Sequence, residues 1–174
     1  MILGSVGSVA SLPGAGQQHI HRDNPLIFGK ECVYEGGNAC VPLLPPYAIT
    51  VAIPLIPADE STGTTRVWLG SHLVEGHEGG QAIDPYMNLG DCLFFDYRVK
   101  HCGLPNKSEQ IRPLVYLTYH RPWFRDVVGN YSETGLINIS PEEYKKIPTQ
   151  HIKLFDWMHF PMSSIPIAER KKQE

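Results

Sequence analysis

The chain has 174 residues, a formal net charge of −3, 42% apolar residues and 19% charged residues. This length favours one domain with a sizeable hydrophobic core. The slight acidic excess argues against nucleic acid and anionic membrane surfaces as partners. No apolar run is long enough to cross a membrane, and no basic residues open the chain as they would a signal peptide.

The four cysteines, Cys32, Cys40, Cys92 and Cys102, form neither a Cys-x-x-Cys pair nor a zinc-finger spacing. A chain of this size does not need a disulfide, so we expect reduced thiols. Reduced thiols without a signal peptide predict an intracellular protein, most simply a cytoplasmic one.

Fifteen prolines and sixteen glycines favour short elements joined by turns over long helices. Residues 2–10 alternate weakly between apolar and polar and predict a strand, and residues 17–25 can form a second one. The clearest strand covers residues 47–56, which are β-branched and nearly all apolar. We expect this strand to lie centrally in a sheet and to be buried on both faces.

One face of the central strand carries only the small residues Ala48, Thr50 and Ala52. A small face with a single hydroxyl suits the wall of a ligand site. It suits equally well a close-packed core in which Thr50 bonds to the backbone.

Three further strands and a helical end complete the pattern. The strands are predicted at residues 64–69, 92–98 and 112–120. The chain bends at residues 99–103, and Ser140, Pro141 and Glu143 form the N-cap, first turn and capping box of a helix. A second short helix is expected within residues 148–160. We therefore predict a mainly β domain, a sandwich or open barrel, with a C-terminal helical segment.

The pair His21 and Asp23 is the first candidate for a functional site. In a strand, residues two apart project from the same face. An imidazole and a carboxylate side by side are two thirds of the two-histidine, one-carboxylate site that holds non-haem Fe(II). His19 shares this face, so either histidine can be the ligand, and a surface strand that carries these residues for solubility is the commoner explanation.

His101 is the candidate third metal ligand, and Arg112 is the candidate residue for binding an anion at the same site. If their strands pair across a turn at residues 105–109, both side chains lie near each other on one face. A guanidinium in a barrel interior requires an anion, because an unpaired buried charge is very unfavourable. A dicarboxylate that chelates a metal at one end would satisfy Arg112 at the other. Each residue alone has an ordinary explanation, and their order along the chain is what indicates the site.

Here the chain resembles the phytanoyl-CoA dioxygenase family of Fe(II)/2-oxoglutarate oxygenases. The matching segments are QHIHRDNPLIF (18–28), LPPYAITVAIPL (44–55), TGTTRVWLGSH (62–72), GDCLFFDYRVKHCG (90–103) and NKSEQIRPLVYLTYHRPWFRD (106–126). The resemblance implies a double-stranded β-helix, a cupin-like jelly roll. It implies His21, Asp23 and His101 as iron ligands, which favours His21 over His19, and Arg112 as the residue that binds 2-oxoglutarate. It also implies that dioxygen is used to oxidise a C–H bond of a small organic or lipid-like substrate.

Two features depart from the family pattern. Gly103 stands two residues after His101, where members often have a hydroxyl residue, so we expect Thr50 or Thr65 to bind 2-oxoglutarate as well. We treat residues 1–174 as one oxygenase domain with a core at 1–126 and an extension at 127–174. In the family, helices and strands usually precede the His-x-Asp motif, whereas residues 1–20 stand before it in this sequence. We therefore expect either a minimal or truncated form, or a homodimer or another chain that completes that side.

Two other functions fit the same residues. The first is a non-catalytic or truncated jelly roll that binds metal. The second is a cupin-like metalloenzyme that works without a cosubstrate, and Arg112 argues against it.

Overall fold

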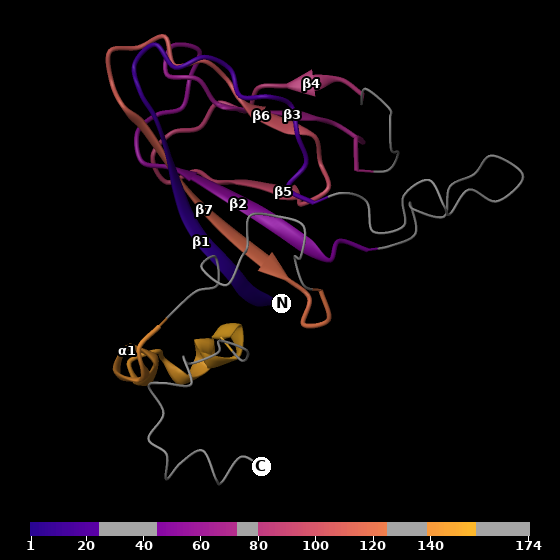
Figure 1. The fold of residues 1–174 in the computed structure, drawn as a ribbon, viewed down its shortest axis with the longest axis vertical. Coiled ribbons are helices and arrows are strands. Elements are labelled where there is room, and N and C mark those ends of the chain that lie inside the picture. Colours follow the sequence, from indigo (N-terminus) through magenta and orange to yellow (C-terminus); the bar gives the residue numbers. More distant parts are fainter. Residues whose placement is uncertain (25–44, 73–79, 125–138, 156–174) are drawn as a thin grey trace, which may run out of the picture.

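The computed structural model describes residues 1–24, 45–72, 80–124 and 139–155, and all structural statements below concern this part of the chain. Within it, seven strands form two antiparallel sheets, and two short helices follow them (Figure 1). The prediction of a mainly β chain with a C-terminal helical segment is confirmed. None of the described helices has the length and apolar content that a membrane span needs.

The larger sheet has the strand order β1-β7-β2-β5. Its strands are β1 (Ile2–Ser11), β7 (Arg112–His120), β2 (Ala48–Pro54) and β5 (Leu93–Asp96). As expected, β2 is central, and Val51 on one face and Ala52 on the other are both buried. A strand with neighbours on both sides and cover on both faces explains why its sequence is nearly all apolar.

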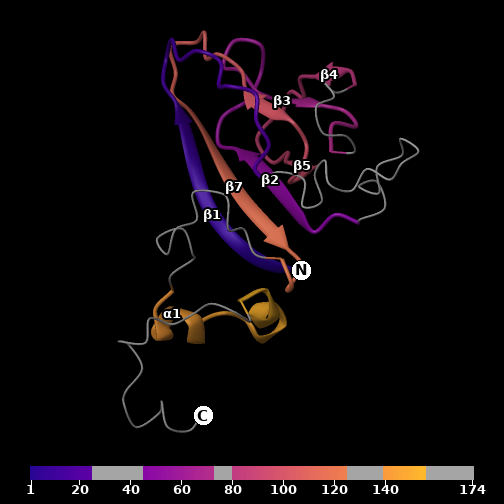
Figure 2. The same ribbon diagram turned by 45° about the vertical axis from the view of Figure 1, so that its right-hand side comes forward.

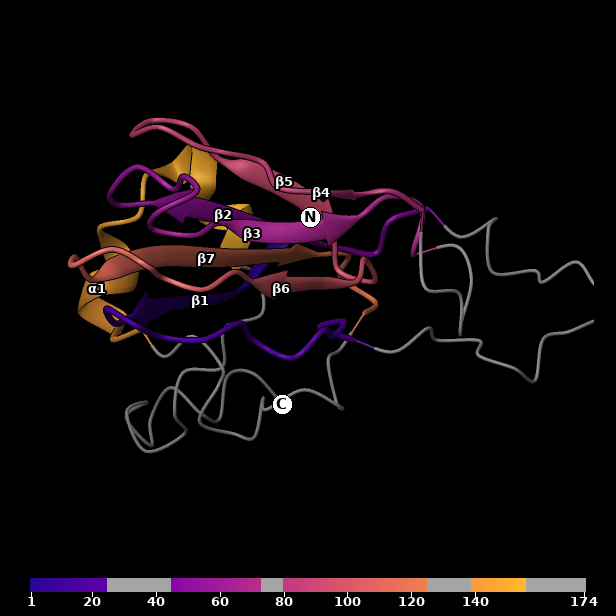
Figure 3. The same ribbon diagram turned by 90° about the horizontal axis from the view of Figure 1, so that it is seen from above.

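The smaller sheet has the order β4-β3-β6. Its strands are β4 (Ala82–Ile83), β3 (Thr65–Trp68) and β6 (His101–Gly103). This sheet lies over one face of the larger one (Figures 2 and 3). The rings of Phe95 in β5 and His101 in β6 pack with their centroids 4.8 Å apart, so the inner faces of the two sheets are in contact.

The His-x-Asp segment is not the regular strand that the sequence predicts. It runs beside β6 and forms one isolated antiparallel bridge, between His21 and His101. Gln18 bonds to Gly103 and His21 bonds to His101, so a spacing of three residues faces a spacing of two. The extra residue interrupts the ladder as a bulge does, and only the bridge survives.

The expected pairing of the His101 and Arg112 strands is also wrong. His101 lies in β6 of the smaller sheet and Arg112 begins β7 of the larger one, so the residues between them cross from one sheet to the other. Pro105 and Asn106 do not make a hairpin turn. Instead, the side-chain amide of Asn106 donates hydrogen bonds to the carbonyls of Ser11 and Gln110, and the backbone N–H of Asn106 donates to the carbonyl of Ala15.

The helical end agrees with its sequence signals. Helix α1 (Pro141–Lys145) begins at Ser140, whose hydroxyl accepts a hydrogen bond from the backbone N–H of Glu143 at 3.1 Å. Within residues 148–160, the described part forms the 3₁₀ helix η3 (Thr149–Phe155), and the remainder lies outside the described residues.

A buried hydrophobic cluster lies beside the start of β2. Tyr47, Ala48, Tyr97 and Phe124 form it, with the rings of Tyr47 and Phe124 4.5 Å apart between centroids. Within the described residues, Cys92 is exposed, Cys102 is buried, and neither forms a disulfide. The other two cysteines, Cys32 and Cys40, lie outside the described residues.

Candidate metal centre

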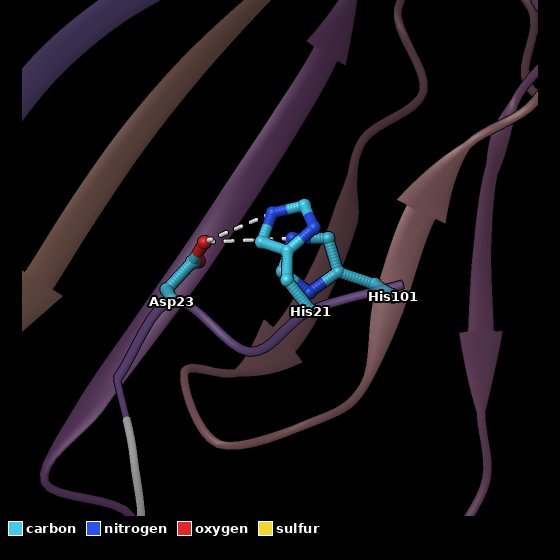
Figure 4. Close-up of side chains that lie close together, drawn as sticks. All are labelled: His21, Asp23 and His101. Carbon is cyan, nitrogen blue, oxygen red and sulfur yellow. Dashed lines mark ion pairs between the residues drawn. The ribbon is translucent and has the colours of Figure 1, made fainter. Parts of the chain in front are cut away.

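Three side chains from the predicted site converge between the sheets (Figure 4). Nε2 of His101 lies 3.4 Å from Oδ1 of Asp23, and Nε2 of His21 lies 3.9 Å from the same oxygen. All three candidate ligand atoms lie within 4.8 Å of one another. Two donors bound at right angles about 2.1 Å from a metal are about 3 Å apart, so the cluster fits a metal after small movements.

Both imidazoles have the tautomer that a metal requires. Nδ1 of His21 lies 2.9 Å from the carbonyl oxygen of His19, and Nδ1 of His101 lies 3.0 Å from that of Val99. A carbonyl oxygen only accepts hydrogen bonds, so each Nδ1 carries the proton and each Nε2 presents its lone pair. His19 therefore orients His21 through its backbone, while its own ring packs beside that of His21 at 4.8 Å between centroids.

The carboxylate of Asp23 is held by Thr50. The Thr50 hydroxyl, on the small face of β2, donates to Oδ2 of Asp23 at 2.9 Å. This leaves Oδ1 toward the two histidines. Thr50 thus lies at the cluster, and its predicted contact with 2-oxoglutarate stays a prediction.

The surroundings of His101 favour its neutral form. Burial lowers the pKa of His101, against the opposing effect of the nearby Asp23 carboxylate. A neutral imidazole is the form that binds a metal. Phe95 packs against the ring and supplies part of that apolar environment.

Arg112 is a buried cation with poor partners. Its side chain is 3% exposed, and its Nη1 donates only to the carbonyls of Thr62 and Leu104 at 3.4 and 3.3 Å. Its Nε is buried and has no hydrogen-bond partner among the described residues. Burial lowers the pKa of Arg112, against a smaller opposing effect of Tyr116. Such a guanidinium is suited to bind an anion.

Two glycines make room around the Arg112 guanidinium. A Cβ at Gly63, where φ is +80°, would lie 2.7 Å from Nη1. A Cβ at Gly103 would lie 3.5 Å from Nη2 and 2.8 Å from Oε1 of Gln18. The Gln18 carboxamide, which accepts a hydrogen bond from the Gly103 N–H at 2.8 Å, therefore occupies the place where residue 103 would carry a side chain.

A hydroxyl pair bridges the sheets near Arg112. Oγ1 of Thr65 lies 3.2 Å from the hydroxyl of Tyr116, and Thr65 is buried. Burial raises the pKa of Tyr116, and the charges of Arg112 and Asp23 act on that pKa in opposite directions. The Tyr116 hydroxyl thus lies close enough to Arg112 and Asp23 for both charges to affect its pKa.

Sequence reasoning missed Tyr116 and Gln18. Tyr116 stands four residues after Arg112 in β7, and the strand alternation places both on one face. The alternation of side chains along this strand could therefore have identified Tyr116 from the sequence. No pattern in the sequence points to Gln18, because its contact with Gly103 depends on the irregular bridge.

The sequence matches a known family. The model of the family described as phytanoyl-CoA dioxygenase (PhyH) matches residues 5–114. The dioxygenase FrzG of Cladobotryum sp is 30% identical in an alignment of 121 positions that covers 63% of this chain and 37% of FrzG. The iron/alpha-ketoglutarate-dependent dioxygenase ausO of Aspergillus calidoustus is 28% identical in an alignment of 116 positions that covers 60% of this chain and 37% of ausO. The chain thus matches well under half the length of these relatives.

Solved structures support the fold. AviO1 from Streptomyces viridochromogenes Tue57 has a TM-score of 0.57 and 20% identity, covering 72% of this chain and 53% of AviO1. A nickel complex of ThoJ, a non-heme monooxygenase, has a TM-score of 0.55 and 18% identity, covering 98% of this chain and 65% of ThoJ. At these identities the likeness concerns the fold alone, and it agrees with the predicted double-stranded β-helix. The match to the family model extends over more than half of the sequence, and we conclude that this chain belongs to the phytanoyl-CoA dioxygenase family.

Proposed function

We propose that the protein is an Fe(II)- and 2-oxoglutarate-dependent dioxygenase that oxidises a C–H bond of a small organic or lipid-like molecule. The observation that carries this proposal is the presence, in one interior, of a two-histidine, one-carboxylate cluster and a buried Arg112 without an acidic partner among the described residues. The name of the relative ausO, an iron/alpha-ketoglutarate-dependent dioxygenase, supports the choice of metal and cosubstrate.

In this proposal His21, Asp23 and His101 hold the iron. Two neutral nitrogens and one carboxylate oxygen are the donor set of non-haem Fe(II) oxygenases, and they leave coordination positions open. When bound, ferrous iron together with 2-oxoglutarate activates dioxygen and oxidises the substrate. The protein holds the donors in place, since both Nδ1 atoms and the distal carboxylate oxygen are already engaged by hydrogen bonds.

Arg112 then binds the distal carboxylate of 2-oxoglutarate. A planar guanidinium can form two parallel hydrogen bonds with a carboxylate, and the anion would relieve the uncompensated buried charge. Tyr116 and Thr65 are hydrogen-bonded to each other, which leaves one of their two hydroxyl hydrogens to donate near Arg112. Gln18 supplies an amide at the position of the missing side chain of residue 103. Thr50 orients Asp23 through its hydroxyl hydrogen, and its contact with 2-oxoglutarate stays a prediction.

The proposal is tested by turnover. The protein is incubated with Fe(II), ascorbate, dioxygen and 2-oxoglutarate, and succinate is measured. We expect succinate from the wild type and none from His21→Ala. His19→Ala is the matched control, because His19 contributes its backbone carbonyl to the site and the substitution keeps that carbonyl.

Binding measurements separate the proposal from the two other functions. Metal binding with 2-oxoglutarate binding but no succinate would indicate the non-catalytic or truncated jelly roll. Metal binding without anaerobic 2-oxoglutarate binding would indicate a metalloenzyme that needs no cosubstrate. Full succinate formation by His21→Ala would overturn the assignment of the ligands.

A further inference from the structure

Arg22 stands between two of the proposed iron ligands in the sequence, and its side chain makes two specific contacts. Its Nε donates to the carbonyl oxygen of Arg98 at 2.9 Å, and its Nη2 donates to the carbonyl oxygen of Ser71 at 2.7 Å. Both acceptors are far away in the sequence. Arg22 therefore joins the His-x-Asp segment to two other parts of the chain.

Both of these parts are connected to His101. Arg98 lies in the turn that leads into β6, three residues before His101. The hydroxyl of Ser71 accepts a hydrogen bond from the backbone N–H of Lys100 at 2.8 Å and donates to the carbonyl of Trp68 at 2.7 Å. Ser71 is fully buried, so this junction is shielded from water. Arg22 thus bonds to the backbone of two residues, Arg98 and Ser71, that are connected to the segment leading to His101.

The His-x-Asp segment needs such a connection. An interrupted ladder attaches it to β6, with a single bridge at His21. Backbone hydrogen bonds join the segment to β6 at Gln18 and His21, whereas a regular strand would continue the ladder through Asp23. A guanidinium suits the task, because its donors are rigidly arranged and its charge does not depend on pH.

We propose that Arg22 is a positioning residue for the metal centre. It fixes His21 and Asp23 against the strand of His101 at the spacing that a metal ion requires. This inference rests on the proposed function, since it assumes that the three residues bind a metal.

The test compares Arg22 with Arg66, because each guanidinium donates two hydrogen bonds, through Nε and Nη2. Arg66 of β3 pairs with Asp84 through Nε and Nη2, both at 2.6 Å, and this pair is not part of the cluster. Arg22→Gln, Arg22→Lys and Arg66→Gln are prepared as metal-free proteins and titrated with Co(II) alone. Co(II) affinity, the visible absorption of the bound Co(II) and the thermal midpoint of the metal-free protein are measured.

We expect Arg22→Gln to weaken Co(II) binding by about 10- to 100-fold and to change the Co(II) spectrum, as loss of a residue that orients ligands does. Arg66→Gln should keep the wild-type affinity and spectrum even where its thermal midpoint falls. Arg22→Lys keeps the positive charge but loses the planar arrangement of two donors, so its affinity for Co(II) should also fall. If Arg22→Gln does not fold, Arg22→Lys decides the question by the same two measurements.

Two results would overturn the inference. One is wild-type affinity and spectrum in the Arg22 variants. The other is an equal loss of affinity in Arg66→Gln, which would mean that general destabilisation is responsible. A wild-type protein that binds no Co(II) would refute the metal centre, and the proposed function with it. Failure of the Arg22 inference alone leaves wild-type metal binding and succinate formation intact.

Discussion

The hydroxyl of Thr50 donates a hydrogen bond to Oδ2 of Asp23 at 2.9 Å, from the central strand of one sheet to the segment that borders the other. Thr50 is buried, so water does not replace this bond when it is lost. The contact fixes which carboxylate oxygen faces His21 and His101.

Replacing Thr50 by Val, which keeps the shape and removes the hydroxyl, should weaken metal binding by about 10- to 100-fold. Thr50→Ser keeps the donor and should retain most of the affinity. Calorimetric titration of both metal-free variants with Co(II) measures the difference. Equal affinities in the Val and Ser variants would show that the hydrogen bond does not orient Asp23.

Replacing Arg112 by Met should raise the concentration of 2-oxoglutarate required for succinate formation. A hydrogen bond to a charged group contributes about 1.5–3 kcal/mol, so the KM should rise by about 10- to 100-fold for each bond lost. The metal-free variant should be at least as stable as the wild type, because the substitution removes a buried charge that lacks a carboxylate partner among the described residues. Thermal unfolding without cosubstrate checks this second effect. A large loss of stability with an unchanged KM would contradict both expectations.

Tyr116→Phe removes one hydroxyl near Arg112 and should raise the KM for 2-oxoglutarate by roughly 2- to 10-fold, the range for a neutral hydrogen bond. Tyr119→Phe is a matched control in the same strand. Tyr119 is three residues further along β7, so it points to the opposite face of the sheet. Its KM should equal that of the wild type, and a similar rise in both variants would exclude a specific role for Tyr116.

Asp59 makes stability depend on pH. Backbone and side-chain hydrogen bonds from Thr62 and Ser61 lower the pKa of Asp59 from 3.8 to about 2. Because the folded pKa is the lower one, this stabilisation is present above pH 3.8 and is lost as the pH falls toward 2. The difference in urea midpoint between the wild type and Asp59→Asn should therefore be larger at pH 6 than at pH 3. A difference that is the same at both pH values would mean that the Asp59 charge is not linked to folding.

The central strand of the larger sheet could be predicted because its sequence carries a strong local signal. Residues 47–56 are apolar and β-branched, and the strand found there, β2, is central and buried. The helix start at Ser140 was equally readable, because a capping box is a local pattern. In both cases a few adjacent residues determine the structure.

The residues of the metal-binding cluster could be predicted, but the backbone pairing around them could not. His21, Asp23 and His101 come together as the motif suggests. The regular strand expected at His21 and Asp23 and the expected pairing of the His101 and Arg112 strands are both wrong. The bulge in the His-x-Asp segment and the crossing of the chain between the sheets depend on long-range contacts. Local periodicity does not report such contacts, and this is also why Gln18 went unnoticed.

The first strand has a consequence for the handling of this protein. β1 is at the outer edge of the larger sheet, its only strand partner within the described residues is β7, and it contains no charged residue or proline. Val6 is 54% exposed and Val9 is 40% exposed. A long, neutral edge with exposed valines is a template for pairing with a further strand. Refolding yield should therefore fall as protein concentration rises, and a lysine at position 9 should act as a gatekeeper that protects the free edge.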